Sequence, residues 1–171
     1  MERILFRIEE AGLTVNGEKL VLAAPEITIV GTTVSKEGKR AQESQVEKIL
    51  NWPTPKTAFE LRGFYGLFNF LCLYAPGCGE AESVIRKRLH GRKGEPIDWD
   101  DEAQRAFDYL KTQLAKRLVL KPIDYKSKRL VIVSVDSSNI AVGVAIWQLN
   151  EQGERQPVPF DSIGFLPVET R

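Results

Sequence analysis

The chain has 171 residues, 43% of them hydrophobic and 27% charged, a composition typical of globular proteins that excludes a disordered or fibrous one. Its formal net charge is +1, so nucleic-acid binding would require a local basic patch. Two cysteines and one histidine exclude a disulfide framework and a histidine-rich zinc site. No apolar run approaches the roughly 20 residues of a membrane span, and we expect an intracellular protein, cytoplasmic or nuclear.

The first forty residues are expected to form a helix and a small hairpin. Residues 2–11 place apolar side chains at helical spacing, and Gly12 is a natural helix stop. Residues 19–22 and 27–34 are strand candidates on either side of a turn that contains proline. Residues 36–39 form a second, polar turn.

The middle of the chain is predicted to be helical. Residues 42–50 carry apolar side chains on one face and end before a Trp-Pro pair. Thr57 and Glu60 match a capping box, in which the two side chains satisfy free backbone N–H groups at a helix start. The helix that follows is apolar over most of its surface, so we expect it to be central. Residues 80–89 predict a further helix that runs into a basic segment.

A last helix and a β-rich end follow. Acidic residues at 98–101 favour a helix start, and apolar positions continue that helix until Pro122. Residues 130–135 predict a buried apolar strand, residues 137–139 a polar turn, and residues 140–147 a strand that returns antiparallel.

A glycine and two prolines interrupt the strands of this β-rich end. Gly143 lies within the returning strand, where glycine indicates a bulge or a close backbone approach. Residues 156–160 are a third strand candidate, weakened by two prolines. The helical middle and the β-rich end suggest two modules that meet between Gly91 and Pro96. We therefore expect an α+β fold, in which a helical domain precedes a three-stranded β unit.

Five segments stand in the order AGLTVNGEKL, IVGTTVSKEG, VEKILNWPTPKTAFELRGFYGLFNF, IDWDDEAQRAFDYLKTQL and VSVDSSNIAVGVAIWQ. Together they resemble the reverse transcriptase of gypsy-type LTR retrotransposons, from the end of the palm, through the thumb, to the start of the ribonuclease H domain. The resemblance covers nearly the whole chain. It implies an end-of-palm helix and primer-grip-like hairpin at 1–40, a thumb-like helical domain at 41–93, a connecting helix at 94–125 and a truncated ribonuclease H-like domain at 126–171.

The resemblance matches Asp136 to the first metal-binding aspartate of that ribonuclease H domain. On its own, Asp136 also fits an aspartate that caps a turn with Ser137 and Ser138. A ribonuclease H site needs about four carboxylates around two metal ions, and Asp136 is the only one that the resemblance identifies here. The paired aspartates of the polymerase site would precede this chain. We expect the isolated chain to be catalytically incomplete and to require no cofactor, with Mg²⁺ bound only if a longer chain or a partner completes the site.

Nucleic-acid contacts are expected at a basic run and at one glycine. The run comprises Arg86, Lys87, Arg88, Arg92 and Lys93, and His90 lies within it. Such charges can neutralise phosphates and release counterions, which makes binding salt-dependent; a solvated helix face is the alternative. Gly31 lies in the strand that the resemblance assigns to gripping the primer, where it would serve the hairpin backbone first and the primer second.

Three functions remain open at this level. The first is a retrotransposon-derived, catalytically incomplete fragment that binds an RNA–DNA hybrid or duplex through its thumb. The second is a domesticated protein-interaction or assembly subunit without nucleic-acid binding. It would use an unpaired edge of strand 130–135 for a partner or for self-association, and apolar residues 70–73 replace the arginines usual in this family. The third is a piece of a longer polyprotein with RNA-directed DNA polymerase and ribonuclease H activity.

Overall fold

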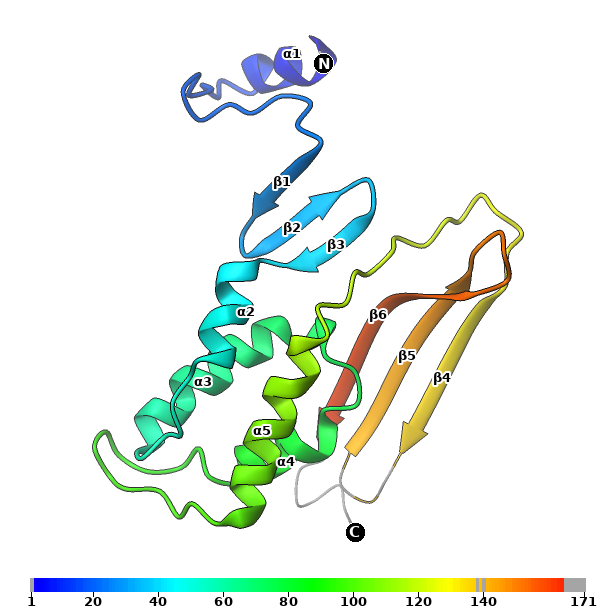
Figure 1. Cartoon of the computed structure of the whole chain (residues 1–171). Coiled ribbons are helices and arrows are strands. Elements are labelled where there is room, and N and C mark those ends of the chain that lie inside the picture. The colour runs from blue at the N-terminus through cyan, green and yellow to red at the C-terminus, as the bar shows by residue number, and fades with distance from the viewer. Residues whose placement is uncertain (1, 138, 140, 165–171) are drawn as a thin grey trace.

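The computed structural model describes residues 2–137, 139 and 141–164. The elements are α1 (Glu2–Glu10), β1 (Glu26–Ile29), β2 (Thr32–Ser35), β3 (Gly38–Ala41), α2 (Glu43–Leu50), α3 (Ala58–Leu71), the 3₁₀ helix η1 (Cys72–Tyr74), α4 (Gly79–Arg86), α5 (Asp101–Ala115), β4 (Val131–Ser137), β5 (Ala141–Leu149) and β6 (Arg155–Gly164). The strands form two antiparallel sheets in the orders β1-β2-β3 and β4-β5-β6. Helix α2 leads from the first sheet to helices α3, α4 and α5, and the second sheet lies beside these helices (Figure 1). The α+β fold class is confirmed.

The N-terminal hairpin differs from its prediction. Residues 19–22 form no strand, and their leucines and valine are exposed, because no neighbouring strand pairs with them among the described residues. The predicted single strand 27–34 is instead β1 and β2, joined by a turn at Val30 and Gly31. Both turn residues have positive φ, 46° and 74°, which is the backbone of a tight hairpin turn.

Helix α1 stands apart from the rest of the chain, as Figure 1 shows. None of its residues is buried, and Ile4 and Phe6 are exposed. Among the described helices, none has the length and apolar character needed to cross a membrane.

The predicted capping box opens helix α3, with one difference. The Thr57 hydroxyl accepts a hydrogen bond from the Glu60 backbone N–H at 3.3 Å, as expected. The Glu60 carboxylate, however, accepts from the Lys56 N–H at 2.7 Å instead of from Thr57. Helix α5 begins with a simple N-cap, in which the Asp100 carboxylate accepts from the Ala103 N–H at 2.8 Å. Helix α4 ends at Arg86, three residues earlier than predicted.

Helix α3 is central, as its composition predicts. Phe64 has no exposed surface and contacts Trp52, Phe68 and Phe107, with ring centroids 4.5 to 6.2 Å apart. The same apolar cluster reaches Phe160 in the second sheet. The predicted separation of two modules between Gly91 and Pro96 is therefore not seen in the packing, since α5 and β6 complete the core that α3 begins. The limits of the four predicted domains stay a prediction.

The second sheet packs on the helices through β6, and β4 forms its outer border (Figure 1). Strand β6 is longer than predicted, and it accommodates its prolines because it is an edge strand. Gly143 makes no close backbone approach: a Cβ there would lie 3.9 Å from the Asp136 carbonyl oxygen. The bulge occurs nearby, between Ala145 and Trp147. Strand β4 is also more exposed than predicted, because only one of its faces is turned toward the core.

Candidate nucleic-acid interface

Arg88 is the one predicted phosphate contact that the structure turns inward. Its guanidinium donates to the carbonyl oxygen of Val84 at 2.9 Å and to that of Asp98 at 3.2 Å. It also pairs with the carboxylates of Asp100 at 2.6 Å and Glu102 at 3.5 Å, and its side chain is only 14% exposed. Arg88 therefore joins the end of α4 to the start of α5. Its geometry is that of a structural residue, so its prediction as a phosphate contact is not supported.

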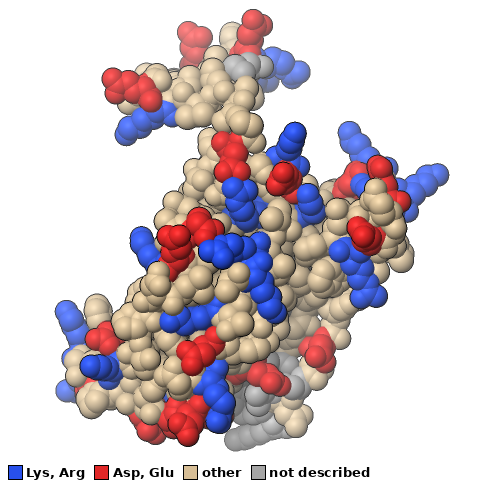
Figure 2. Space-filling view, in the orientation of Figure 1, with Lys and Arg blue, Asp and Glu red and all other residues tan. Residues whose placement is uncertain are grey.

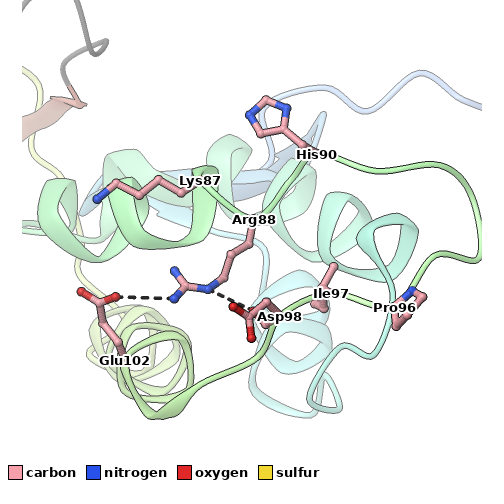
Figure 3. A pocket seen from close by; sticks show the side chains of 7 residues that line it. All are labelled: Lys87, Arg88, His90, Pro96, Ile97, Asp98 and Glu102. Atoms are coloured by element: carbon pink, nitrogen blue, oxygen red, sulfur yellow. Dashed lines mark hydrogen bonds and ion pairs between the residues drawn. The ribbon is translucent and has the colours of Figure 1, made fainter.

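Lys87 and His90 lie beside Arg88 at a shallow pocket of about 380 Å³. Figure 3 shows Arg88 directed toward Asp98 and Glu102, while Lys87 points away from them. The pocket combines basic and acidic side chains, which offers no single-sign surface to a phosphate chain.

Arg86 is the last residue of α4. Its charge acts on Tyr65, whose hydroxyl donates to the buried Glu82 carboxylate at 3.4 Å. Burial, with the Glu82 charge second, raises the pKa of Tyr65 to about 12. The charge of Arg86 thus acts on a polar pair, Tyr65 and Glu82, that is at least half-buried.

Arg92 and Lys93 lie in a loop that runs along the first turns of α3. Arg62, on α3, donates to the carbonyl oxygens of Leu89 at 3.3 Å and Gly91 at 3.1 Å, which holds the loop against the helix. The Lys93 ammonium lies 5.2 Å from the centre of the Phe59 ring, a cation–π contact. Sequence reasoning missed Arg62, since nothing in the sequence shows that it reaches a loop almost thirty residues away.

Gly31 lies at the opposite end of α3. A Cβ at this position would lie 2.7 Å from the Gln45 amide and 2.8 Å from the Phe70 ring, so the hairpin turn rests directly on α2 and α3. The Gly31 carbonyl accepts from the Gln42 N–H at 2.9 Å, and the Tyr74 hydroxyl bonds to the Thr32 hydroxyl at 3.3 Å. The backbone requirement predicted for Gly31 is therefore present.

An exposed stripe of α3 connects these two ends. It consists of Phe59, Gly63, Gly66 and Phe70, which are three or four residues apart and so share one face of the helix. At about 1.5 Å per residue, Phe59 and Phe70 are about 16 Å apart along the axis. A Cβ at Gly66 would meet nothing within 4 Å, so the middle of this α3 stripe is bare backbone open to an approaching molecule.

The charge around the α3 stripe is modestly positive at the Phe59 end. The local charge is +2, from four basic and two acidic residues. These are Lys56, Arg62, Arg92 and Lys93, and Glu60 and Glu95. Over the face of the molecule seen in Figure 2, blue and red side chains alternate without a large single-sign region. Any electrostatic attraction must therefore be local.

Asp136 is exposed on β4, opposite Gly143 of β5. Within the described part of the chain, no three histidine, cysteine or acidic side chains come together where they could hold a metal ion. The described residues therefore do not fit the two-metal chemistry of a ribonuclease H. Neither of the two described cysteines forms a disulfide; Cys78 is fully buried, and burial raises its pKa to about 12.

Residues 99–171 match the family of RNase H-like domains found in reverse transcriptase. The chain is 25% identical over 159 residues to the Transposon Tf2-3 polyprotein of Schizosaccharomyces pombe, and the Tf2-4 polyprotein matches equally. The aligned region is 93% of this chain but 12% of each relative, so the chain spans about an eighth of their length.

Solved structures share the fold of this chain. The foamy viral protease-reverse transcriptase dRH in complex with dsDNA superposes with a TM-score of 0.76 at 24% identity, over 99% of this chain and 29% of that one. The same viral protein in complex with an RNA/DNA hybrid gives 0.75 at 25% identity, over 99% and 22%. Residues 99–171 are thus similar to the RNase H-like domain found in reverse transcriptase, and the chain as a whole is similar to one part of retrotransposon polyproteins.

Proposed function

We propose that this chain is a gypsy-type reverse-transcriptase fragment that binds an RNA–DNA hybrid or DNA duplex along the α3 stripe, without completing a catalytic site. The observation that carries the proposal is the stripe itself, with an open glycine backbone at its centre and the Gly31 turn at one end. Two solved relatives bound to such duplexes support the substrate class.

The contact would have two parts. The bare helix backbone at Gly66 lets the duplex approach closely, while the Trp52 ring lies against Gly63. Arg92 and Lys93, beside the first turn of α3, would neutralise phosphates at one end. The separation of about 16 Å between the two ends matches about five nucleotide steps of 3.4 Å, so the stripe would follow one strand for that distance.

Replacing Gly66 tests the proposal. The Gly66→Leu variant folds normally, since the space is open and leucine favours helix, but its side chain stands between the helix and the duplex. We expect the dissociation constant for a fluorescent RNA–DNA hybrid, measured by fluorescence anisotropy, to rise at least tenfold. Ala115→Leu, which places the same leucine side chain at an exposed position of α5, is the control and should bind as the wild type does. Equal binding by all three proteins would refute the proposal.

Metal-dependent cleavage would need more than this chain's described residues supply. Asp136 could serve as one ligand of Mg²⁺, and further carboxylates would have to come from a longer chain or a partner. Polymerase and ribonuclease H activity are therefore proposed only for a longer polyprotein that contains this region.

A second candidate function, protein binding, is favoured by one observation. Strand β4 is an edge of its sheet, and Val131, Val133 and Val135 are 41%, 59% and 64% exposed. An exposed apolar edge strand is a template for another strand. We propose this edge as the surface for a protein partner.

A further inference from the structure

The loop between α4 and α5 carries Arg92 and Lys93, and it is held against the start of α3 at two places. The first is Arg62, an exposed residue of α3. Its guanidinium Nη1 donates to the carbonyl oxygens of Leu89 at 3.3 Å and Gly91 at 3.1 Å. A charged donor makes such bonds stronger than a neutral one does. Arg62 therefore fixes the incoming arm of the loop.

The outgoing arm of the same loop is fixed by backbone contacts to the start of α3. The Glu95 carbonyl accepts from the Ala58 N–H at 3.4 Å, and the Ile97 N–H donates to the Lys56 carbonyl at 3.2 Å. Between the two arms, the Glu95 carboxylate accepts from the Arg92 N–H at 2.6 Å. With both arms held, the tip of the loop has a defined place beside the first turn of α3.

The two arms differ in what holds them. The incoming arm depends on the side chain of Arg62, whereas the outgoing arm is held by backbone groups. The incoming arm also passes close to the helix, because a Cβ at Gly91 would lie 3.3 Å from the Ala58 Cβ. Removing the Arg62 guanidinium would release this arm. The conformational entropy lost when the loop is ordered again would then oppose the binding of phosphates.

We propose that Arg62 is a positioning residue for duplex binding. It holds the loop so that Arg92 and Lys93 meet phosphates at the Phe59 end of the α3 stripe. The inference deepens the function proposed above and rests on it. Because Arg62 uses its Nη1 group on two loop carbonyls, its effect on binding passes through Arg92 and Lys93. A direct phosphate contact by Arg62 would instead act independently of them.

A double-mutant cycle tests whether Arg62 acts through the loop. We expect Arg62→Ala to raise the dissociation constant for a fluorescent RNA–DNA hybrid at least fivefold, and R92A/K93A to raise it at least tenfold. In the R92A/K93A background, Arg62→Ala should change the dissociation constant less than twofold, because the residues that it positions are gone. Arg105→Ala, which removes an exposed arginine of α5, is the control and should bind as the wild type does.

Hydrogen exchange of the free protein gives a second readout, which needs no duplex. In Arg62→Ala, the amides of residues 89–95 should exchange at least tenfold faster than in the wild type, while those of α5 keep their rates. Unchanged exchange in the loop, faster exchange throughout α5, or an equally large effect of Arg62→Ala in the R92A/K93A background would each overturn the inference and leave duplex binding standing. A wild-type chain that does not bind the hybrid would overturn the proposed function, and the inference with it.

Discussion

Replacing Arg88 should destabilise the fold far more than replacing its neighbour Lys87. In the Arg88→Ala variant, the carbonyl oxygens of Val84 and Asp98 lose a charged donor, and the link between α4 and α5 is cut. Lys87 is exposed and leaves no such groups behind. The two residues are adjacent in the basic run and each variant removes one positive charge. The difference between the variants therefore measures the effect of burial alone.

The magnitude follows from the contacts of Arg88. A hydrogen bond from a charged donor is worth about 1.5–3 kcal/mol. The carboxylates of Asp100 and Glu102 are 47% and 61% exposed, so water screens their attraction and we add nothing for it. With one good and one longer bond to carbonyl oxygens, we expect a loss of about 2–3 kcal/mol. For a chain of this size that lowers the melting temperature by about 4–12 °C.

Thermal and urea unfolding, followed by circular dichroism, measure this difference. The Lys87→Ala variant should remain within about 0.5 kcal/mol of the wild type. The reasoning is refuted if the two variants are equally stable, or if Arg88→Ala keeps full stability and instead loses duplex binding.

Three further predictions concern the core and its titrating groups. Phe64→Ala should cost about 3–5 kcal/mol in urea unfolding, because Phe64 is fully buried among three aromatic rings; a loss below 1 kcal/mol would contradict this packing. Because burial raises the pKa of Tyr65 from 10 to about 12, its contribution is intact below pH 10 and is lost as the pH rises toward 12. The Tyr65→Phe variant should therefore lose less stability than the wild type across that interval, and parallel loss in both proteins would show that Tyr65 is not the cause. Iodoacetamide should modify Cys78 in a Cys72→Ser variant only after unfolding, since its thiol is buried and protonated at neutral pH; mass spectrometry of the native protein would reveal the contrary.

The local signals in the sequence were sufficient for the helices. Thr57 with Glu60, and the acids before residue 101, located the starts of α3 and α5, because helix caps depend on residues three or four apart. The fold class followed from the change of hydrophobic period from helical to alternating. The prediction of a single strand over residues 27–34 was wrong at Val30, because an exposed valine occupies a turn that usually needs asparagine or glycine.

The candidate site was less accessible to sequence reasoning, because it depends on long-range contacts. The basic run reads as one patch, yet the structure buries Arg88, ties Arg86 to Tyr65 and places Lys93 on Phe59. Gly66 had no signal of its own, since only the packing of α3 shows that one of its faces stays open. Spacing along a chain cannot give the direction of a side chain at the end of a helix.

The salt dependence of hybrid binding tests the central proposal most directly. The slope of log Kd against log salt counts neutralised phosphates, at about 0.9 per contact on B-DNA and about 0.7 on a single strand. We predict that the double variant R92E/K93E, at the end of the α3 stripe, weakens binding and lowers this slope by about one to two. The single variant K87E, at the mixed-charge pocket, should leave the slope nearly unchanged. An unchanged slope in R92E/K93E, or an equal change in K87E, would contradict binding along α3.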